Sequence, residues 1–223
     1  MKKHWYDYFW IWTIVYFLLG FFNILFAWLG LFDFLVPLLL ALFGGDKWFC
    51  HHMCGRSQLL TVMAKAPERA NGKRLKKWKD AGSVGEKPKK LPGICRNKPT
   101  PSFLPSKGFR YGFLVFFLTM FGNILYQTWR VYGGASLRQA IKLFWTFRIP
   151  WGWAYTAGSS PAWVAQFAFG FYSLMLTSAL IGVIMMVLFK PRTWCSFCPM
   201  GTMTQLICKI KYRKLKDQGE GTR

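Results

Sequence analysis

The sequence predicts an all-α membrane protein with four transmembrane helices, arranged as a duplicated two-helix unit in which each copy ends in a cytoplasmic cysteine motif. Three observations support this fold class. The 223 residues are 53% hydrophobic and 19% aromatic, yet the formal net charge is +22. The apolar residues come in long blocks with the charges between them, and two of these blocks are followed by a pair of closely spaced cysteines.

The apolar blocks cover residues 8–43, 109–129 and 162–189. A helix that crosses a bilayer needs about 20 apolar residues, so the last two blocks fit one span each. The first block is long enough for two short spans joined near residues 28–30. It is also much longer than the apolar core of a signal peptide, and no small-residue cleavage site follows it, so we expect it to be retained.

The distribution of Lys and Arg predicts the orientation. These residues are dense in the segment 65–107 and in the tail after Lys190, but sparse in the connection 131–161. Because cytoplasmic loops are the ones rich in Lys and Arg, we expect both termini to face the cytoplasm of a bacterial or archaeal inner membrane. This topology explains the positive charge without nucleic-acid binding, which we do not expect. Basic loops instead attract anionic lipids or an acidic protein partner.

An internal repeat relates the two halves. The segment "GFFNILFAW" around Asn23 resembles "MFGNILYQTW" around Asn123, and "CGRSQLLTVMAK" resembles "CPMGTMTQLICKIK". We expect the two asparagines to hydrogen-bond across helix interfaces. The second copy has a longer outer connection, in which basic and aromatic residues alternate as in an amphipathic surface helix. The expected units are residues 1–66 (first repeat), 67–107 (basic cytoplasmic loop), 108–212 (second repeat) and 213–223 (basic tail).

The two cysteine motifs point to one metal site. Cys50 and Cys54 are about one helical turn apart, as are Cys195 and Cys198, so each pair can direct both sulfurs the same way. Parallel repeats related by a pseudo-two-fold axis would bring the pairs together. Four thiolates suit a tetrahedral zinc ion or an iron–sulfur cluster.

The residues that follow each motif favour metal binding. Gly55 and Pro199 come directly after the second cysteines, and each precedes a predicted short helix. Proline suits the first helical position, so the second cysteine would be the N-cap, where the helix dipole favours a thiolate. Nearby positive charges would offset a tetrathiolate cluster: Lys47, Arg56, Lys190 and Arg192.

Other interpretations of the motifs remain open. Disulfides are rare in the cytoplasm, and structural zinc usually organises small soluble domains. Copper(I) is the main alternative, because soft ligands lie beside the cysteines: His51, His52, Met53, Met200 and Met203. Such a chain would be a copper-handling assembly factor. A third possibility is a non-redox membrane anchor that recruits partners through its basic loop.

Two further types of candidate ligand are set aside. With three histidines, two of them adjacent, the chain lacks the paired ligands of a typical cytochrome b. Cys95 and Cys208 fall outside both repeats, so we expect them not to be ligands.

One acidic residue of the first apolar block has a possible role in proton transfer. Asp33, if buried, could accept a proton from a quinol.

The four spans, the element "W-C-x-x-C-P-x-G" after the last one and the related motif after the second resemble NapH/NosR-type membrane iron–sulfur proteins. The resemblance implies electron transfer between the quinone pool and a dedicated redox enzyme. In that family both motifs usually read Cys, three residues, Cys–Pro, whereas here Gly55 follows the first motif and the second spacer is Ser196–Phe197. The resemblance and the two cysteine pairs together predict one iron–sulfur cluster, of the 4Fe–4S type. Its expected ligands are Cys50, Cys54, Cys195 and Cys198.

The resemblance also implies partners. Members of the family commonly carry a soluble ferredoxin module, and no run of closely spaced cysteines supplies one before Arg223. The hydrocarbon core is about 30 Å thick, so a single cluster at its cytoplasmic edge cannot serve both faces. We therefore expect a redox subunit of a quinone-linked, multi-subunit oxidoreductase complex.

Overall fold

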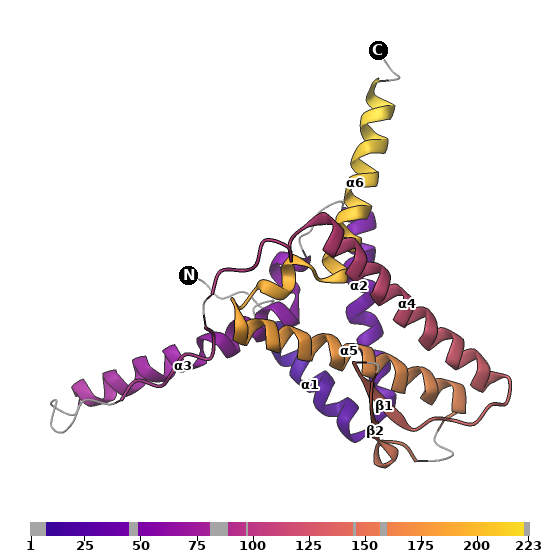
Figure 1. Cartoon of the computed structure of the whole chain (residues 1–223), viewed down its shortest axis with the longest axis horizontal. Helices are drawn as coiled ribbons and strands as arrows, with labels where there is room; N and C mark the ends of the chain where they lie inside the picture. Colours follow the sequence, from indigo (N-terminus) through magenta and orange to yellow (C-terminus); the bar gives the residue numbers. More distant parts are fainter. Residues whose placement is uncertain are drawn as a thin grey trace.

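The computed structural model describes residues 8–44, 49–80, 89–96, 98–144, 146–156 and 160–220. The first half contains helix α1 (Phe9–Phe22), the 3-10 turn η2 (Ile24–Trp28), helix α2 (Leu29–Gly44), the π-helical turn η3 (Phe49–Met53) and helix α3 (Gly55–Asp80). The second half contains α4 (Lys107–Tyr132), strands β1 (Ala140–Leu143) and β2 (Phe147–Pro150), the turn η4 (Gly152–Ala154), α5 (Ala162–Leu188), the turn η5 (Thr193–Ser196) and α6 (Pro199–Glu220) (Figure 1).

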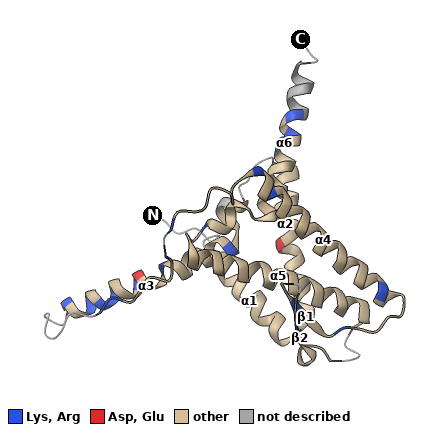
Figure 2. Cartoon of the chain, in the orientation of Figure 1, with Lys and Arg blue, Asp and Glu red and all other residues tan. Residues whose placement is uncertain are grey.

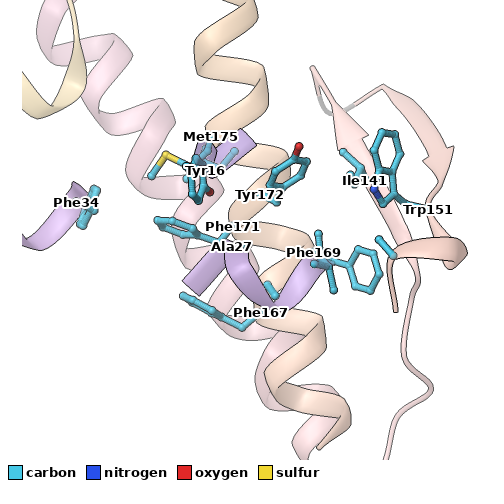
Figure 3. Packing of buried hydrophobic residues seen from close by; sticks show 14 of the residues in the cluster. Tyr16, Ala27, Phe34, Ile141, Trp151, Phe167, Phe169, Phe171, Tyr172 and Met175 are labelled. Carbon is cyan, nitrogen blue, oxygen red and sulfur yellow. The ribbon is translucent and has the colours of Figure 1, made fainter. Parts of the chain in front are cut away.

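Helix α5 is the centre of the core. It is apolar on every side, as expected of a helix that other elements surround, and its Phe169 and Phe171 are fully buried. Helix α4 and the η2 turn both pack against it. Figure 3 shows Tyr16 and Ala27 from the first half among the α5 side chains. The Tyr172 hydroxyl donates to the Phe17 carbonyl at 2.9 Å, which ties α5 to α1.

Three helices of the described chain are long and apolar enough to cross a bilayer: Ile24–Phe43, Lys107–Tyr132 and Ala162–Leu188. Large apolar side chains on the first two of these are exposed, for example Leu118 and Tyr126, as expected where lipid covers them. The protein therefore has the pattern of a membrane protein. Helix α1 is apolar but has 14 residues, so the predicted count of four spans is not confirmed.

The first apolar block is split into two helices, as predicted, but the break lies at Asn23 rather than near residues 28–30. Asn23 has extended backbone angles (φ −140°, ψ 114°) and ends α1. Its side-chain oxygen accepts the backbone N–H of Leu25 at 3.0 Å and so begins the η2 turn. The expectation that Asn23 bonds across a helix interface is wrong, because its side-chain oxygen caps the turn instead.

The connection between α4 and α5 is a β-hairpin, so the prediction of an amphipathic helix there is wrong. The fold is otherwise helical, as predicted. Strands β1 and β2 are antiparallel, with Ile141 opposite Ile149. Apolar residues alternate with other residues along both strands, which is the strand period and not the helical one. Gly134, at φ +97°, stops α4 from continuing. Ile141 is fully buried against the core, and Figure 3 shows it beside Tyr172.

Helices α3 and α6 are longer than the short helices expected. Helix α3 runs to Asp80 and so crosses the predicted boundary between the first repeat and the basic loop at residues 66–67. Pro67 lies inside it and is buried. Figures 1 and 2 show both helices extending away from the other elements, with Lys and Arg along the outer part of α3 and on the described part of α6.

The packing of these helices follows the same scheme in both halves. Helix α1 contacts α3, and α4 contacts α6, so the first helix of each half packs on its own terminal helix. Helix α2 contacts α6, and α5 contacts α3, so the second helix packs on the terminal helix of the other half. This exchange brings the beginnings of α3 and α6 to one place.

Candidate metal centre

All four predicted cysteine ligands line one cavity of about 110 Å³. Cys50 lies in the η3 turn and Cys195 in the η5 turn, while Cys54 and Cys198 directly precede α3 and α6. Each of the six helices contributes at least one residue to the lining. The fold therefore joins two cysteine pairs that lie far apart in the sequence.

The second cysteine of each pair is a helix N-cap, as predicted. The Cys54 carbonyl accepts the N–H of Gln58 at 3.1 Å, and the Cys198 carbonyl accepts the N–H of Thr202 at 3.0 Å. In addition, backbone N–H groups of the first helical turn donate to the two sulfurs. Such donors stabilise a thiolate.

The first cysteine of each pair reaches a hydroxyl group of the other half. The Cys195 sulfur lies 3.5 Å from Ser57 Oγ on α3. The Cys50 sulfur lies 3.9 Å from Thr204 Oγ1 on α6. Ser57 and Thr204 occupy matching positions, since each directly precedes the Gln–Leu pair that relates the two halves. The sequence showed this likeness, but not that the hydroxyl groups cross to the opposite motif.

The glutamines of the same pairs hold each terminal helix in place. Gln58 Oε1 accepts the backbone N–H of Trp10 on α1 at 3.2 Å. Gln205 Oε1 accepts from the Arg110 guanidinium on α4. Each glutamine thus binds the first helix of its own half, while the hydroxyl group before it faces the cysteine of the other half.

Burial opposes loss of the proton from the second thiol of each pair, Cys54 and Cys198. Burial raises the pKa of Cys54 to about 12, an effect that the neighbouring Cys198 and Cys195 reinforce and that the Ser57 N–H and Arg56 oppose. Burial likewise raises the pKa of Cys198, against the N–H groups of the first α6 turn. Because metal ligation requires the thiolate, a bound cation must supply the missing positive charge.

Of the four cations that were predicted to offset the charge of a cluster, Arg56 lines the cavity. Its guanidinium donates to Ser178 Oγ on α5 at 2.8 Å and also contacts the Met175 sulfur. Lys190 and Arg192 do not line the cavity, and Lys47 lies outside the described residues.

The other candidate residues of the sequence divide into two groups. Met53 and Met200 line the cavity together with Met175. His52 is exposed, and the side chain of His51 lies outside the described part. Residues that do not line the cavity are Met203, Cys95 and Cys208.

A carboxylate lines the same cavity. Asp33 on α2 accepts the indole N–H of Trp12 on α1 at 3.2 Å, and both residues line the cavity. Trp12 is 40% exposed, so the cavity reaches the surface beside this pair. The cavity thus extends from the cysteines to a proton-accepting group on a predicted span.

The space around Gly55 explains why the first motif lacks the proline of the second. A Cβ atom built on Gly55 would lie 2.7 Å from the Phe9 carbonyl oxygen and would also overlap Thr13 of α1. Any side chain at this position would push α3 away from α1. Pro199, in the matching position, lines the cavity as Gly55 does.

The donor set is of the kind that holds an iron–sulfur cluster. The four thiols line one cavity, and in a 4Fe–4S cluster each cysteine binds a different iron. These residues therefore fit that cofactor.

Comparisons with known proteins agree with this site. Residues 26–73 and 173–216 match the model of the 4Fe-4S binding domain family. Each matched segment contains one cysteine motif, all or part of the helix before it and part of the helix after it. No curated protein and no solved structure matched the chain. Two segments of the chain thus match the 4Fe–4S binding domain, one around each cysteine motif, and this match supports an iron–sulfur cluster as the cofactor.

Proposed function

We propose that this protein is a membrane electron-transfer subunit that passes electrons between the quinone pool and a partner oxidoreductase. A 4Fe–4S binding domain indicates iron–sulfur electron transfer. The observation that carries the proposal is the common cavity of Cys50, Cys54, Cys195 and Cys198, to which each matched segment contributes two cysteines. We assign these four residues as the ligands of one cluster.

The other residues of the cavity support reaction with a quinol. When bound, the cluster takes up and releases one electron at a time. Oxidation of a quinol to a quinone releases two electrons and two protons, so the site also needs a proton acceptor. Asp33 is a carboxylate on the same cavity, reachable beside the exposed ring of Trp12. We propose that Asp33 accepts one quinol proton, and that Arg56 balances negative charge at the cluster.

A one-electron site that reacts with a two-electron donor requires a second acceptor nearby. We therefore infer that the protein works in a complex with other redox subunits. The Lys- and Arg-rich parts of α3 and α6 offer a surface for an acidic partner (Figure 2). Within the described residues, the two cysteines outside the motifs, Cys95 and Cys208, do not line the cysteine cavity.

The proposed topology follows from the charges. We propose four spans, including α1, in a bacterial or archaeal inner membrane, with both termini and both cysteine motifs on the cytoplasmic side. The matching contacts of the two halves support a duplicated unit. The resemblance to NapH/NosR-type proteins belongs to the same proposal, because the matched domain is broader than that group.

Copper handling is the second candidate, because three thioethers line the cysteine cavity. Met53, Met175 and Met200 could join the cysteines as soft ligands for copper(I). Such a protein would be an assembly factor and would not exchange electrons with a quinone.

Anaerobic purification in a mild detergent, followed by metal analysis and electron paramagnetic resonance, separates these functions. The proposal expects iron and acid-labile sulfide in equal amounts, a resonance that appears on reduction, and stoichiometric redox subunits in the preparation. Copper in place of iron would establish the alternative. Iron with no quinol-dependent reduction, in protein and in isolated complex alike, would refute the quinone-linked function while leaving the cluster in place.

A further inference from the structure

A second cavity, of about 350 Å³, lies between α4, α5 and the β-hairpin. It shares no lining residue with the cysteine cavity, although the two are neighbours: Phe117 of α4 lines the first and Met120 the second. Nothing in the proposed electron transfer uses it.

Three cations line this cavity and are held there by the fold. They are Arg138, Lys142 and Arg148. The backbone N–H of Arg138 donates to the buried Gln166 side chain of α5 at 3.0 Å. The backbone N–H of Lys142 donates to the buried Ser173 hydroxyl at 3.0 Å. These bonds fix β1 and the residues before it against α5.

The three cations lie at one cavity, where Lys142 is half-buried and Arg138 and Arg148 are exposed. Lys142 and Arg148 are direct partners across the hairpin, and like charges in that position repel. Burial, followed by the charges of Arg148 and Arg138, lowers the pKa of Lys142. The chain contains no Asp or Glu between Glu86 and Asp217, so the half that builds the cavity cannot neutralise it.

The remaining lining is partly polar and partly apolar. Asn123 and Gln127 of α4 offer amide groups, and Met120, Ile124 and Leu174 form an apolar surface. The α4 and α5 residues concerned lie within two candidate membrane spans.

We propose that this cavity binds a phosphate-bearing anionic ligand, whose phosphate lies among Arg138, Lys142 and Arg148 and whose apolar part lies over Met120, Ile124 and Leu174. A phosphate has oxygens in several directions and can accept from three cations at once, whereas a carboxylate presents two oxygens in one plane. Arginine also matches phosphate with paired N–H donors. The phosphate can come from an anionic lipid headgroup or from a free phosphate compound.

Binding can be tested on the full-length, cluster-loaded protein in detergent. Delipidated protein is titrated with phosphatidylglycerol, with zwitterionic phosphatidylcholine and with inorganic phosphate, and binding is followed by native mass spectrometry and by the shift in Tm. We expect phosphatidylglycerol to bind more tightly than phosphatidylcholine. Lys142→Gln and Arg148→Gln should each weaken that binding by about tenfold, the worth of one charge-assisted hydrogen bond.

The control is Arg130→Gln, because Arg130 is an exposed cation at the end of α4 that does not line this cavity. It should bind phosphatidylglycerol as the wild type does. Tm of Arg148→Gln without lipid should equal or exceed that of the wild type, since a like-charge pair is removed. If inorganic phosphate gives the same shift, the ligand is a free phosphate; if only phosphatidylglycerol does, it is a lipid.

Two results would overturn the proposal. The first is wild-type protein that binds phosphatidylglycerol and phosphatidylcholine equally and does not respond to phosphate. The second is phosphatidylglycerol binding that Lys142→Gln and Arg148→Gln leave unchanged. Because iron content is expected to be the same in all of these variants, failure here leaves the proposed electron transfer untouched.

Discussion

The two halves of the chain are alike at their cysteine ends and different at their outer ends. At the cysteine ends, each half supplies a turn with one cysteine, a second cysteine as an N-cap, and a hydroxyl group that faces the opposite motif. At the outer ends, the similar segments around Asn23 and Asn123 form different structures. The first ends a helix and begins a 3-10 turn, whereas the second continues as α4 to Tyr132.

This difference shows which part of the repeated sequence must keep the same structure in both halves. The four thiols meet at one cavity only if both cysteine ends keep the same construction. The outer ends carry no such demand, because α1 and α2 are joined by a short turn and α4 and α5 by a hairpin that packs on the core. The connection, and not the local sequence, decides where each first helix ends.

The largest expected effect comes from breaking the cysteine ends one half at a time. We expect Cys50→Ser and Cys198→Ser each to abolish iron binding, although they lie in different halves, because half of a ligand set cannot hold a 4Fe–4S cluster. Iron per chain after anaerobic purification measures this. Cys95→Ser and Cys208→Ser are the controls, since neither residue lines the cavity, and both should keep the wild-type iron content. Equal loss in Cys95→Ser would show that the ligand assignment is wrong.

The sequence predicted most of the site because the chemistry is local. The spacing of each cysteine pair, the helix that follows it and the repeat around it were enough to anticipate a cavity lined by Cys50, Cys54, Cys195 and Cys198 and the two N-caps. What it did not predict depends on contacts between the halves. The exchange of Ser57 and Thr204 requires each terminal helix to pack on the second helix of the other half, and no periodicity within one segment predicts that packing.

The fold was predicted less completely. The long apolar blocks gave the helices correctly, but the break in the first block was misplaced by about one turn. Asn23 ends α1 because its side chain caps the next turn, while Asn123 in a similar segment does not end α4. The hairpin was missed because its basic and aromatic residues were taken for a helical surface, although their alternation has the strand period.

The next largest effect should come from the two glycines of the cysteine ends, Gly55 and Gly201. A Cβ on Gly55 would overlap the Phe9 carbonyl and Thr13, whereas a Cβ on Gly201 meets nothing within 4 Å. We expect Gly55→Ala to lower the free energy of unfolding by about 1–3 kcal/mol, the usual cost of overpacking, and to reduce the iron retained. Gly201→Ala should be neutral, because it keeps the backbone N–H that faces Cys198. Chemical unfolding in detergent measures both, and equal losses would contradict the tight α1–α3 contact.

The outer ends should show a smaller and one-sided effect. Asn23→Ala removes the acceptor of the Leu25 N–H, so we expect a loss of about 1 kcal/mol in the free energy of unfolding, as for other caps. Asn123→Ala should change it by no more than about 0.5 kcal/mol, because Asn123 lies inside α4 and Ala is a better helix former. Thermal unfolding of the two variants without added lipid makes the comparison. A larger loss for Asn123→Ala would mean that Asn123, and not Asn23, has the structural role.

The smallest effect concerns the reduction potential of the cluster. It tests the contacts in which a hydroxyl group of one half faces a cysteine of the other, namely Ser57 with Cys195 and Thr204 with Cys50. When Cys195 and Cys50 bind a cluster as thiolates, they have no proton to give, so the hydroxyl groups must be the donors. Ser57 can then donate to Cys195, and Thr204 can donate to Cys50 by turning from the Gly201 carbonyl, to which it donates at 3.2 Å. Donors to cluster sulfurs stabilise the more negative, reduced state and so raise the potential. We expect Ser57→Ala and Thr204→Val each to lower the potential by roughly tens of millivolts, where 59 mV is a factor of ten for one electron.

The size and additivity of these shifts distinguish a shared role from two unrelated contacts. Ser57→Ala should have the larger effect, because its hydroxyl oxygen lies 3.5 Å from the Cys195 sulfur and that of Thr204 lies 3.9 Å from the Cys50 sulfur. The double variant should show the sum, since the two hydroxyl groups bind different sulfurs. Thr202→Val is the matched control, because its hydroxyl donates to the Cys198 carbonyl and not to a sulfur. Spectroscopic redox titration of cluster-loaded protein gives all four values. A shift in Thr202→Val as large as that in Thr204→Val would mean that loss of any nearby hydroxyl perturbs the cluster, and the correspondence between the two halves would then be one of packing alone.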